Sequence, residues 1–223
     1  MDELRAEQVL RIDAEDPKKI IQLFEPLVID RRRERLLHVI GQRLASVTVL
    51  MEAPHDPHNG AAVARSCEAF GVQKLHVVEQ REKFLAAASV TRGAHKWIDI
   101  EAYANADSAL ERLLAQGMEL VATHPEGELL PEDLASIERV ALVFGNERDG
   151  ISAAVRSACS RSVRVPMRGF IESLNVSVTA AILLSAATRN RAGDLGPNDH
   201  QRLYARGLYF SCAQADKILG WST

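Results

Sequence analysis

Hydrophobic positions recur at two different spacings along the chain. Apolar residues at helical spacing in residues 17–28 and 32–44 predict two amphipathic helices. Short apolar runs further along predict strands at 47–52, 75–79, 97–100, 119–123, 140–144 and 163–165. Helices are predicted between or after these runs, at 59–70, 107–116, 152–159 and 174–192. Strands that alternate with helices indicate an α/β protein with a mostly parallel sheet and helices on both of its faces.

These elements suggest three parts, namely an N-terminal helical extension over 1–44, an α/β domain over 45–192 and a C-terminal helical tail over 193–223. The length of 223 residues fits one main domain with such appendages. The longest uncharged stretch, residues 173–188, is shorter than the roughly 18 apolar residues that a membrane span needs. The acidic, polar N-terminus resembles neither a signal peptide nor a transit peptide. Three widely spaced cysteines indicate neither a disulfide framework nor a zinc site, so we expect a reduced, cytoplasmic protein without a bound metal.

Charge is strongly segregated along the chain although the net charge is only −3. Residues 98–149 contain twelve acidic residues and three arginines, whereas residues 151–206 contain eight arginines and three acidic residues. Residues 31–43 carry five arginines and one glutamate. Such a chain can present basic surfaces to a polyanion while being acidic in total. Arginine outnumbers lysine 21 to 6, which suits phosphate contacts, but genomic base composition and a solvated helix face are alternative explanations.

Several common nucleotide-binding and hydrolase motifs are absent from the sequence. The chain has no G-x-G-x-x-G and no G-x-x-x-x-G-K-[ST], which argues against a dinucleotide-binding Rossmann site and a P-loop NTPase. It also has no H-E-x-x-H and no G-x-S-x-G, so a zincin or an α/β-hydrolase has no support.

One polar pair stands out in the first predicted helix of the α/β domain. Asn59 is a good N-cap residue, and Arg65 follows six residues later. Arg65 is flanked by small apolar side chains, where a guanidinium is costly to bury without an anion or carboxylate partner. A capped helix with an ordinary ion-paired arginine is the structural alternative.

Two glycine-containing loops follow predicted strands. Residues 142–152 (LVFGNERDGIS) carry a buried strand into a loop at a strand end, the place where open α/β sheets bind ligands. Residues 165–178 (VPMRGFIESLNVSV) lead through proline and glycine into a long helix that Ser173 or Asn175 can cap. Taken singly, a plain turn and a helix cap also explain these residues.

Together, the patterns N-x5-R, F-G-N-E-x-x-G-I-S and P-M-x-G-x-x-x-S-L-N-V-S-V resemble the three motifs of the SpoU/TrmH branch of SPOUT RNA 2′-O-methyltransferases, in the same order. The resemblance runs from about residue 46 to residue 191. The flanking sequences VTVLMEAPHDPHN and HQRLYARGLY are most similar to those of tRNA guanosine 2′-O-methyltransferases, whose target is the D-loop guanosine at tRNA position 18.

The resemblance implies a fold, a cofactor and partners. The fold is the SPOUT fold, whose C-terminal part is tied into a trefoil knot that holds S-adenosylmethionine, although ordinary connection rules do not predict a knot. The partners are tRNA and a second copy of the chain, in a homodimer whose active sites draw on both chains. The catalytic residues implied by the motif match are Arg65, Asn59, Glu147, Ser173 and Asn175. The cofactor-binding residues implied are Thr123, Gly145, Val165, Met167 and Leu174, and the RNA-binding residues are Arg31, Arg32, Arg33, Arg35 and Arg168.

The sequence departs from the family pattern at Gly60, Glu172, Ser185 and Ala186, the last two in the helix expected at the dimer interface. The alternatives are methylation of ribosomal RNA or of another tRNA loop, and a non-catalytic RNA-binding factor on the same scaffold. A nucleotide-binding dehydrogenase is disfavoured by the missing glycine pattern. Only about 45 residues precede the α/β domain, which favours tRNA because many relatives that act on ribosomal RNA carry a separate N-terminal domain.

Overall fold

The computed structural model describes residues 2–54, 56–78, 93–146 and 148–221. These residues form two compact units, a central unit over Leu44–Ala192 and a terminal unit that combines Glu3–Arg43 with the chain from Gly193 onward. The two ends of the chain therefore fold together. No helix in the described part of the chain is long and apolar enough to cross a membrane.

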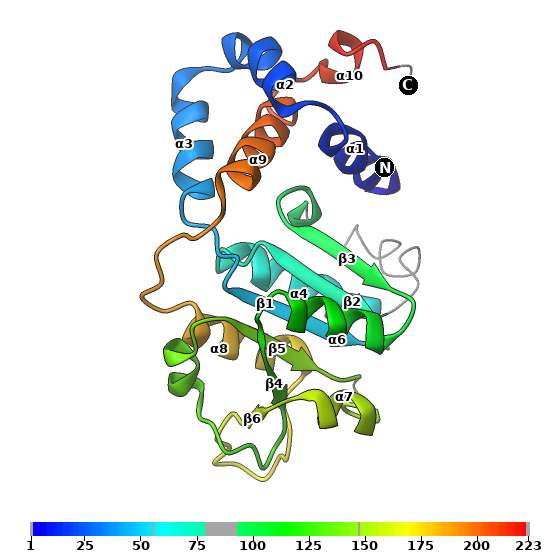
Figure 1. Cartoon of the computed structure of the whole chain (residues 1–223), viewed down its shortest axis with the longest axis vertical. Helices are drawn as coiled ribbons and strands as arrows, with labels where there is room; N and C mark the ends of the chain where they lie inside the picture. The colour runs from blue at the N-terminus through cyan, green and yellow to red at the C-terminus, as the bar shows by residue number, and fades with distance from the viewer. Residues whose placement is uncertain (1, 55, 79–92, 147, 222–223) are drawn as a thin grey trace. The chain divides into compact units, whose positions relative to one another are not determined.

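The central unit is built on a six-stranded sheet in the order β3-β2-β1-β5-β4-β6, with every paired neighbour parallel (Figure 1). The strands are β1 (Val47–Glu52), β2 (Lys74–Val78), β3 (Asp99–Tyr103), β4 (Glu119–Thr123), β5 (Val140–Phe144) and β6 (Arg161–Val163). The neighbours β1 and β5 lie in the middle of the sheet and are buried over almost their whole length, as expected for parallel strands covered on both faces. The predicted α/β class with a parallel sheet is confirmed.

Helices cover both faces of this sheet. One apolar core joins the sheet to α4 (Pro57–Ala69), α8 (Val176–Ala187) and η4 (Pro131–Ser136). The other joins it to α6 (Ala106–Ala115) and α7 (Ala153–Ala158). Neighbouring residues of β5 alternate between the two cores, because side chains along a strand point to opposite faces: Leu142 belongs to the first core and Val143 to the second.

Some element boundaries differ from the prediction. The strand predicted at 97–100 is β3 at Asp99–Tyr103, and a short helical turn, η3 (Ala94–Lys96), precedes it. β6 ends at Val163, where the predicted strand begins, since its register is set by pairing with β4. The last helix of the unit begins at Val176, two residues later than predicted, because the Asn175 side chain caps it.

The terminal unit is helical. Its elements are α1 (Asp2–Asp13), α2 (Pro17–Phe24), η1 (Glu25–Leu27), α3 (Asp30–Ile40), α9 (Pro197–Tyr209) and α10 (Ala215–Ile218). The helix α9 packs against both α2 and α3, and the rings of Phe24 and Tyr209 meet edge to face with centroids 6.2 Å apart. The α9 helix thereby holds the two ends of the chain in one core.

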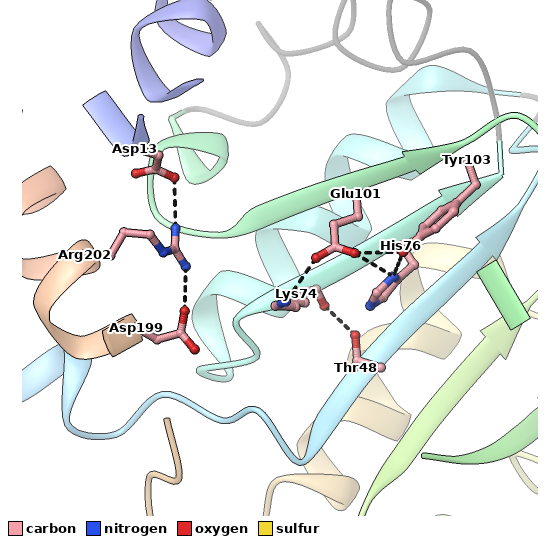
Figure 2. A network of polar contacts seen from close by, with 8 residues as sticks. All are labelled: Asp13, Thr48, Lys74, His76, Glu101, Tyr103, Asp199 and Arg202. Atoms are coloured by element: carbon pink, nitrogen blue, oxygen red, sulfur yellow. Dashed lines mark hydrogen bonds and ion pairs between the residues drawn. The ribbon is translucent and has the colours of Figure 1, made fainter. Parts of the chain in front are cut away.

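Ion pairs reinforce this terminal core. Asp13 accepts a hydrogen bond from Arg202 at 2.9 Å, and Arg202 also pairs with Asp199 at 3.1 Å (Figure 2). A second guanidinium, that of Arg206, bonds to Asp13 at 2.9 Å and is only 1% exposed. Because a buried guanidinium needs a carboxylate partner, Asp13 is the residue that makes burial of Arg206 tolerable.

A polar cluster also lies within the sheet of the central unit, on the face covered by α6. Tyr103 donates a hydrogen bond to Glu101 at 2.7 Å and lies 2.9 Å from Nδ1 of His76, while Lys74 donates to Glu101 at 3.0 Å (Figure 2). Burial lowers the pKa of His76 to about 4, although the nearby Glu101 carboxylate opposes this shift. The histidine is therefore neutral at physiological pH and serves as a buried polar link between β2 and β3.

Candidate functional site

A pocket of about 460 Å³ lies at the carboxyl ends of β4, β5 and β6. This volume falls within the range of small-molecule sites, and the position is the one at which open α/β sheets bind ligands. The pocket is lined by Thr123, His124, Pro125, Phe144, Gly145, Asn146, Gly150, Ile151, Val163, Val165, Met167, Glu172, Ser173, Leu174, Asn175, Val176 and Thr179. We call it the strand-end pocket.

The loop after β5 forms one wall of the strand-end pocket. Asn146 and Gly150 form an isolated antiparallel bridge with two backbone hydrogen bonds of 3.1 Å. The Asn146 side chain accepts hydrogen bonds from the backbone N–H groups of Arg148 and Asp149, at 2.9 and 2.7 Å. A Cβ at Gly145 would lie only 2.0 Å from the carbonyl carbon of Gly150, so only glycine fits there. Hydrogen bonds thus hold this turn closed, and Gly145, Asn146 and Gly150 line the pocket.

The segment after β6 forms the opposite wall and ends at the N-terminus of α8. Asn175 is the N-cap of α8, and its Oδ1 accepts hydrogen bonds from the backbone N–H of Ser177 at 2.8 Å and from the Ser177 hydroxyl at 2.6 Å. Its Nδ2 donates to Oδ1 of Asn59 at 3.0 Å. This single side chain therefore caps α8 and also joins the first predicted motif to the third.

The role predicted for Asn59 as a helix cap is wrong. The helix α4 begins at Pro57, and the side chain of Asp56 accepts the capping hydrogen bond from the backbone N–H of His58 at 2.8 Å. Proline at the first helical position and aspartate before it are a favourable start, and they begin the helix two residues before the predicted position. Asn59 lies inside the first turn, which leaves its side chain available for Asn175.

Arg65 lies apart from the strand-end pocket within one chain. Its side chain is exposed on α4 and lines a separate groove with Trp97. No hydrogen bond or ion pair to Arg65 occurs within the described residues, so the ordinary ion-paired arginine considered from the sequence is not observed there.

The other predicted site residues are distributed as follows. All five predicted cofactor-binding residues, together with Ser173 and Asn175, line the strand-end pocket. Glu147 lies outside the described residues. In the terminal unit, Arg31 and Arg35 are exposed on α3, while Arg32 donates to the Ser211 hydroxyl at 3.0 Å and Arg33 pairs with Asp30. Arg168 is exposed in the segment after β6.

Several pocket residues were not predicted from the sequence. His124 and Pro125 follow β4 directly, and Asn146 follows Gly145. The rule that ligands bind beyond the carboxyl ends of parallel strands points to all three, because each stands just after a predicted strand. Thr179 is different, since it enters the pocket one turn into α8.

These features define a class: an open α/β protein with a small-molecule pocket built from loops at the carboxyl ends of parallel strands. The model of the SpoU rRNA methylase family matches residues 46–185. The chain is 33% identical over 172 residues to the tRNA (guanosine(18)-2′-O)-methyltransferase of Borreliella burgdorferi, a match that covers 76% of this chain and 78% of that protein. The chain belongs to the SpoU rRNA methylase family.

Solved structures agree with this assignment. The crystal structure of the A. aeolicus TrmH/SpoU tRNA modifying enzyme has a TM-score of 0.70 at 29% identity, covering 81% of this chain and 96% of that one. The SpoU methyltransferase AviRb from Streptomyces viridochromogenes, solved in complex with the cofactor AdoMet, has a TM-score of 0.60 at 25% identity, covering 67% of this chain and 58% of that one. The parallel six-stranded sheet of the central unit is therefore the sheet of this family.

Proposed function

We propose that the protein transfers a methyl group from S-adenosylmethionine to a ribose 2′-hydroxyl of tRNA, at the guanosine of position 18. The observation that carries the proposal is the strand-end pocket, which the second and third motif segments build together. Relatives similar over most of the chain are named tRNA (guanosine(18)-2′-O)-methyltransferases, which supports tRNA over ribosomal RNA.

The residues of the strand-end pocket fit S-adenosylmethionine. Val163, Val165 and Leu174 supply apolar side chains suited to an adenine ring, and Gly145, which has no side chain, lets a ligand approach the backbone closely. Thr123 donates a hydrogen bond from its hydroxyl to the carbonyl oxygen of Val143 at 3.0 Å, which joins the ends of β4 and β5 beneath the proposed cofactor site. The bound cofactor supplies an activated methyl group on a sulfonium.

The protein must then orient the ribose hydroxyl and remove its proton. Arg65 is proposed to act on the substrate, but a guanidinium stays protonated in proteins and is therefore a poor general base. Arg65 is better suited to clamp the neighbouring phosphate and to stabilise negative charge that develops on the ribose oxygen. Ser173, Asn175 and Glu147 are proposed to complete the site, and Asn59 to position Asn175 through their hydrogen bond.

A homodimer explains why Arg65 and the strand-end pocket are separate in one chain. The helix α8 has no charged residue, and its Val178 and Ile182 are 46% and 37% exposed, four residues apart on one face. We propose that this face packs against a second copy and that Arg65 of one chain completes the site of the other. An Ile182→Arg variant should be monomeric by analytical ultracentrifugation and inactive; a dimeric variant would contradict this interface.

We further propose that the C-terminal part of the central unit forms the trefoil knot of the family. Leu129 donates its N–H to Ser162 at 2.9 Å and accepts from Arg164 at 3.0 Å, so the chain after β4 lies along β6. Beyond α8, Arg191 donates to the carbonyl oxygens of Ile137 and, at 2.7 Å, of Glu138. The chain just before 164–175 and the chain after it therefore both contact residues 129–138. A crystal structure traced through 124–192 tests whether the chain passes through a loop, as the knot requires.

The terminal unit is proposed to hold the tRNA backbone, while the central unit is proposed as the methyltransferase domain. Arg31 and Arg35 lie four residues apart on α3 and are exposed, whereas Arg32 and Arg33 have partners within their own unit. Replacing Arg31 and Arg35 by alanine should raise the KM for tRNA and reduce the salt dependence of binding by about 1–2 in log–log slope. An unchanged slope would remove α3 from the RNA interface.

The decisive experiment is methyl transfer from S-adenosylmethionine to bulk tRNA and, separately, to ribosomal RNA, followed by mapping of the modified ribose. Methylation of guanosine 18 in tRNA alone is expected. Arg65→Ala should nearly abolish transfer while the Kd for S-adenosylmethionine is unchanged, and Arg112→Ala, another exposed arginine, is the matched control. Methylation of ribosomal RNA only, or an active Arg65→Ala variant, would contradict the proposal.

A further inference from the structure

A second cavity, of about 580 Å³, lies in the central unit between α4 and the turn η3 that precedes β3. The α4 side contributes Arg65, Glu68, Ala69 and Phe70, and the η3 side contributes Ala94 and Trp97, so the groove carries one cationic and one acidic side chain. We call it the Trp97 groove. Among the residues that the structure describes, none lines both this groove and the strand-end pocket.

Local structure places the aromatic rings and the arginine around this groove. Ala62, Arg65 and Ala69 line it because residues three and four positions apart share one face of a helix. The small alanines leave room between the rings. The Trp97 backbone is held by two hydrogen bonds, since its N–H donates to Ala94 at 2.9 Å and its carbonyl oxygen accepts from Gln73 at 3.2 Å. The indole is therefore presented from a fixed turn.

The chemistry of the groove matches an unstacked nucleotide. Single-stranded bases of RNA are recognised by stacking on aromatic side chains, and their phosphates by arginine. Here Trp97 and Phe70 provide ring surfaces, and Arg65 provides a guanidinium that has no partner within the described residues. A groove for an apolar peptide would not need a cation at its edge, whereas a nucleotide needs an aromatic surface for its base and a cation for its phosphate.

We propose that the Trp97 groove receives the base of the nucleotide whose ribose is methylated, with Trp97 as the stacking platform. This inference rests on the proposed function, since the base occupies the groove while Arg65 binds the adjacent phosphate. Trp97 is then a positioning residue: it fixes the base, so that the ribose hydroxyl is presented in one orientation. Stacking on Trp97 compensates for the stacking on neighbouring bases that the target base loses when it leaves the tRNA fold.

The test is a cycle of two changes, Trp97→Ala in the protein and removal of the base at the mapped target nucleotide in the RNA. With wild-type protein, loss of the base should lower kcat/KM about 5- to 150-fold, the effect of one base–aromatic stack. With Trp97→Ala, removal of the base should change kcat/KM by less than about threefold, because the indole ring on which the base would stack is already missing. Trp97→Phe should retain most activity, and thermal unfolding with S-adenosylmethionine titration checks that each variant is folded.

A fluorescence measurement gives a readout independent of activity. The chain contains two tryptophans, Trp97 and Trp221, so a Trp221→Phe protein reports on the groove alone. Intact tRNA should quench its emission, and tRNA lacking the target base should not. Independent, multiplicative losses in the cycle, or equal quenching by both RNAs, would overturn the inference while leaving methyl transfer established. Absence of methyl transfer by the wild-type protein would instead refute the proposed function.

Discussion

Gly145→Ala is the most direct perturbation of the strand-end pocket. The added Cβ would lie 2.0 Å from the carbonyl carbon of Gly150 and 2.2 Å from the backbone nitrogen of Ile151, against an ordinary contact of about 3.5–4.0 Å. Both neighbours are backbone atoms, so the turn has to open by about 1.5 Å and no side chain can rotate away.

Opening the turn breaks the bridge between Asn146 and Gly150, which consists of two backbone hydrogen bonds of 3.1 Å. At about 0.5–1.5 kcal/mol each, their loss costs about 1–3 kcal/mol. If the cofactor binds only the closed turn, its Kd rises by about 5- to 150-fold. Isothermal titration of S-adenosylmethionine into the wild type and Gly145→Ala measures this change, and circular dichroism verifies the fold.

Gly169→Ala is the matched control in the segment after β6. A Cβ there meets no atom within 4 Å, and the backbone does not adopt the left-handed region. Its Kd for S-adenosylmethionine should therefore equal that of the wild type. A folded Gly145→Ala protein that binds the cofactor with wild-type affinity would refute the assignment of the closed turn to the cofactor site.

Three further predictions concern stability and the link between motifs. The free energy of unfolding should fall by up to about 3 kcal/mol as the pH is lowered from about 6.5 to 4, because His76 takes up a proton in the unfolded chain but stays neutral when folded, with a pKa of about 4. Urea unfolding of His76→Gln should show a weaker pH dependence of this free energy. Asp13→Ala should destabilise the terminal unit by about 3–5 kcal/mol in thermal unfolding, whereas Asp199→Ala should cost less than about 1 kcal/mol. Equal effects of the two changes would contradict the role of the buried pair of Asp13 and Arg206. Asn175→Asp should retain the cap of α8 and the melting temperature but lose the donor to Asn59 and most methyl transfer; full activity would show that this contact is dispensable.

Arg65 and the strand-end pocket are separate within one chain, which affects how the proposed methyl-transfer site is assembled. Within one chain, the motif segments meet at the bond between Asn59 and Asn175, and Arg65 points into the Trp97 groove. A site completed by a second chain would couple catalysis to assembly. The Asn175→Asp variant and the Arg65→Ala variant then provide a complementation test, since mixing two inactive proteins that still dimerise restores activity only if each site draws on both chains.

The local pattern of apolar residues was sufficient to predict most strands of the sheet. The predicted bounds of β1, β4 and β5 coincide with those observed, because each is a short apolar run limited by polar residues, proline or glycine. Boundaries set by side-chain caps or by pairing were less accurate. The beginning of α4 depends on Asp56 and Pro57, and the end of β6 depends on its register with β4.

The α/β class and the motif segments could be predicted from the amino-acid sequence alone, since hydrophobic period and glycine position are local properties of the chain. The family resemblance implied Thr123, Gly145 and Leu174 as cofactor-binding residues, and their places at strand ends or before a helix agree with the one pocket that they line. The core that the two ends of the chain share around Asp13, and the groove that Trp97 and Arg65 line together, became apparent only in the folded structure. Both are contacts between residues far apart in sequence, and such contacts depend on how helices pack, which no local pattern encodes.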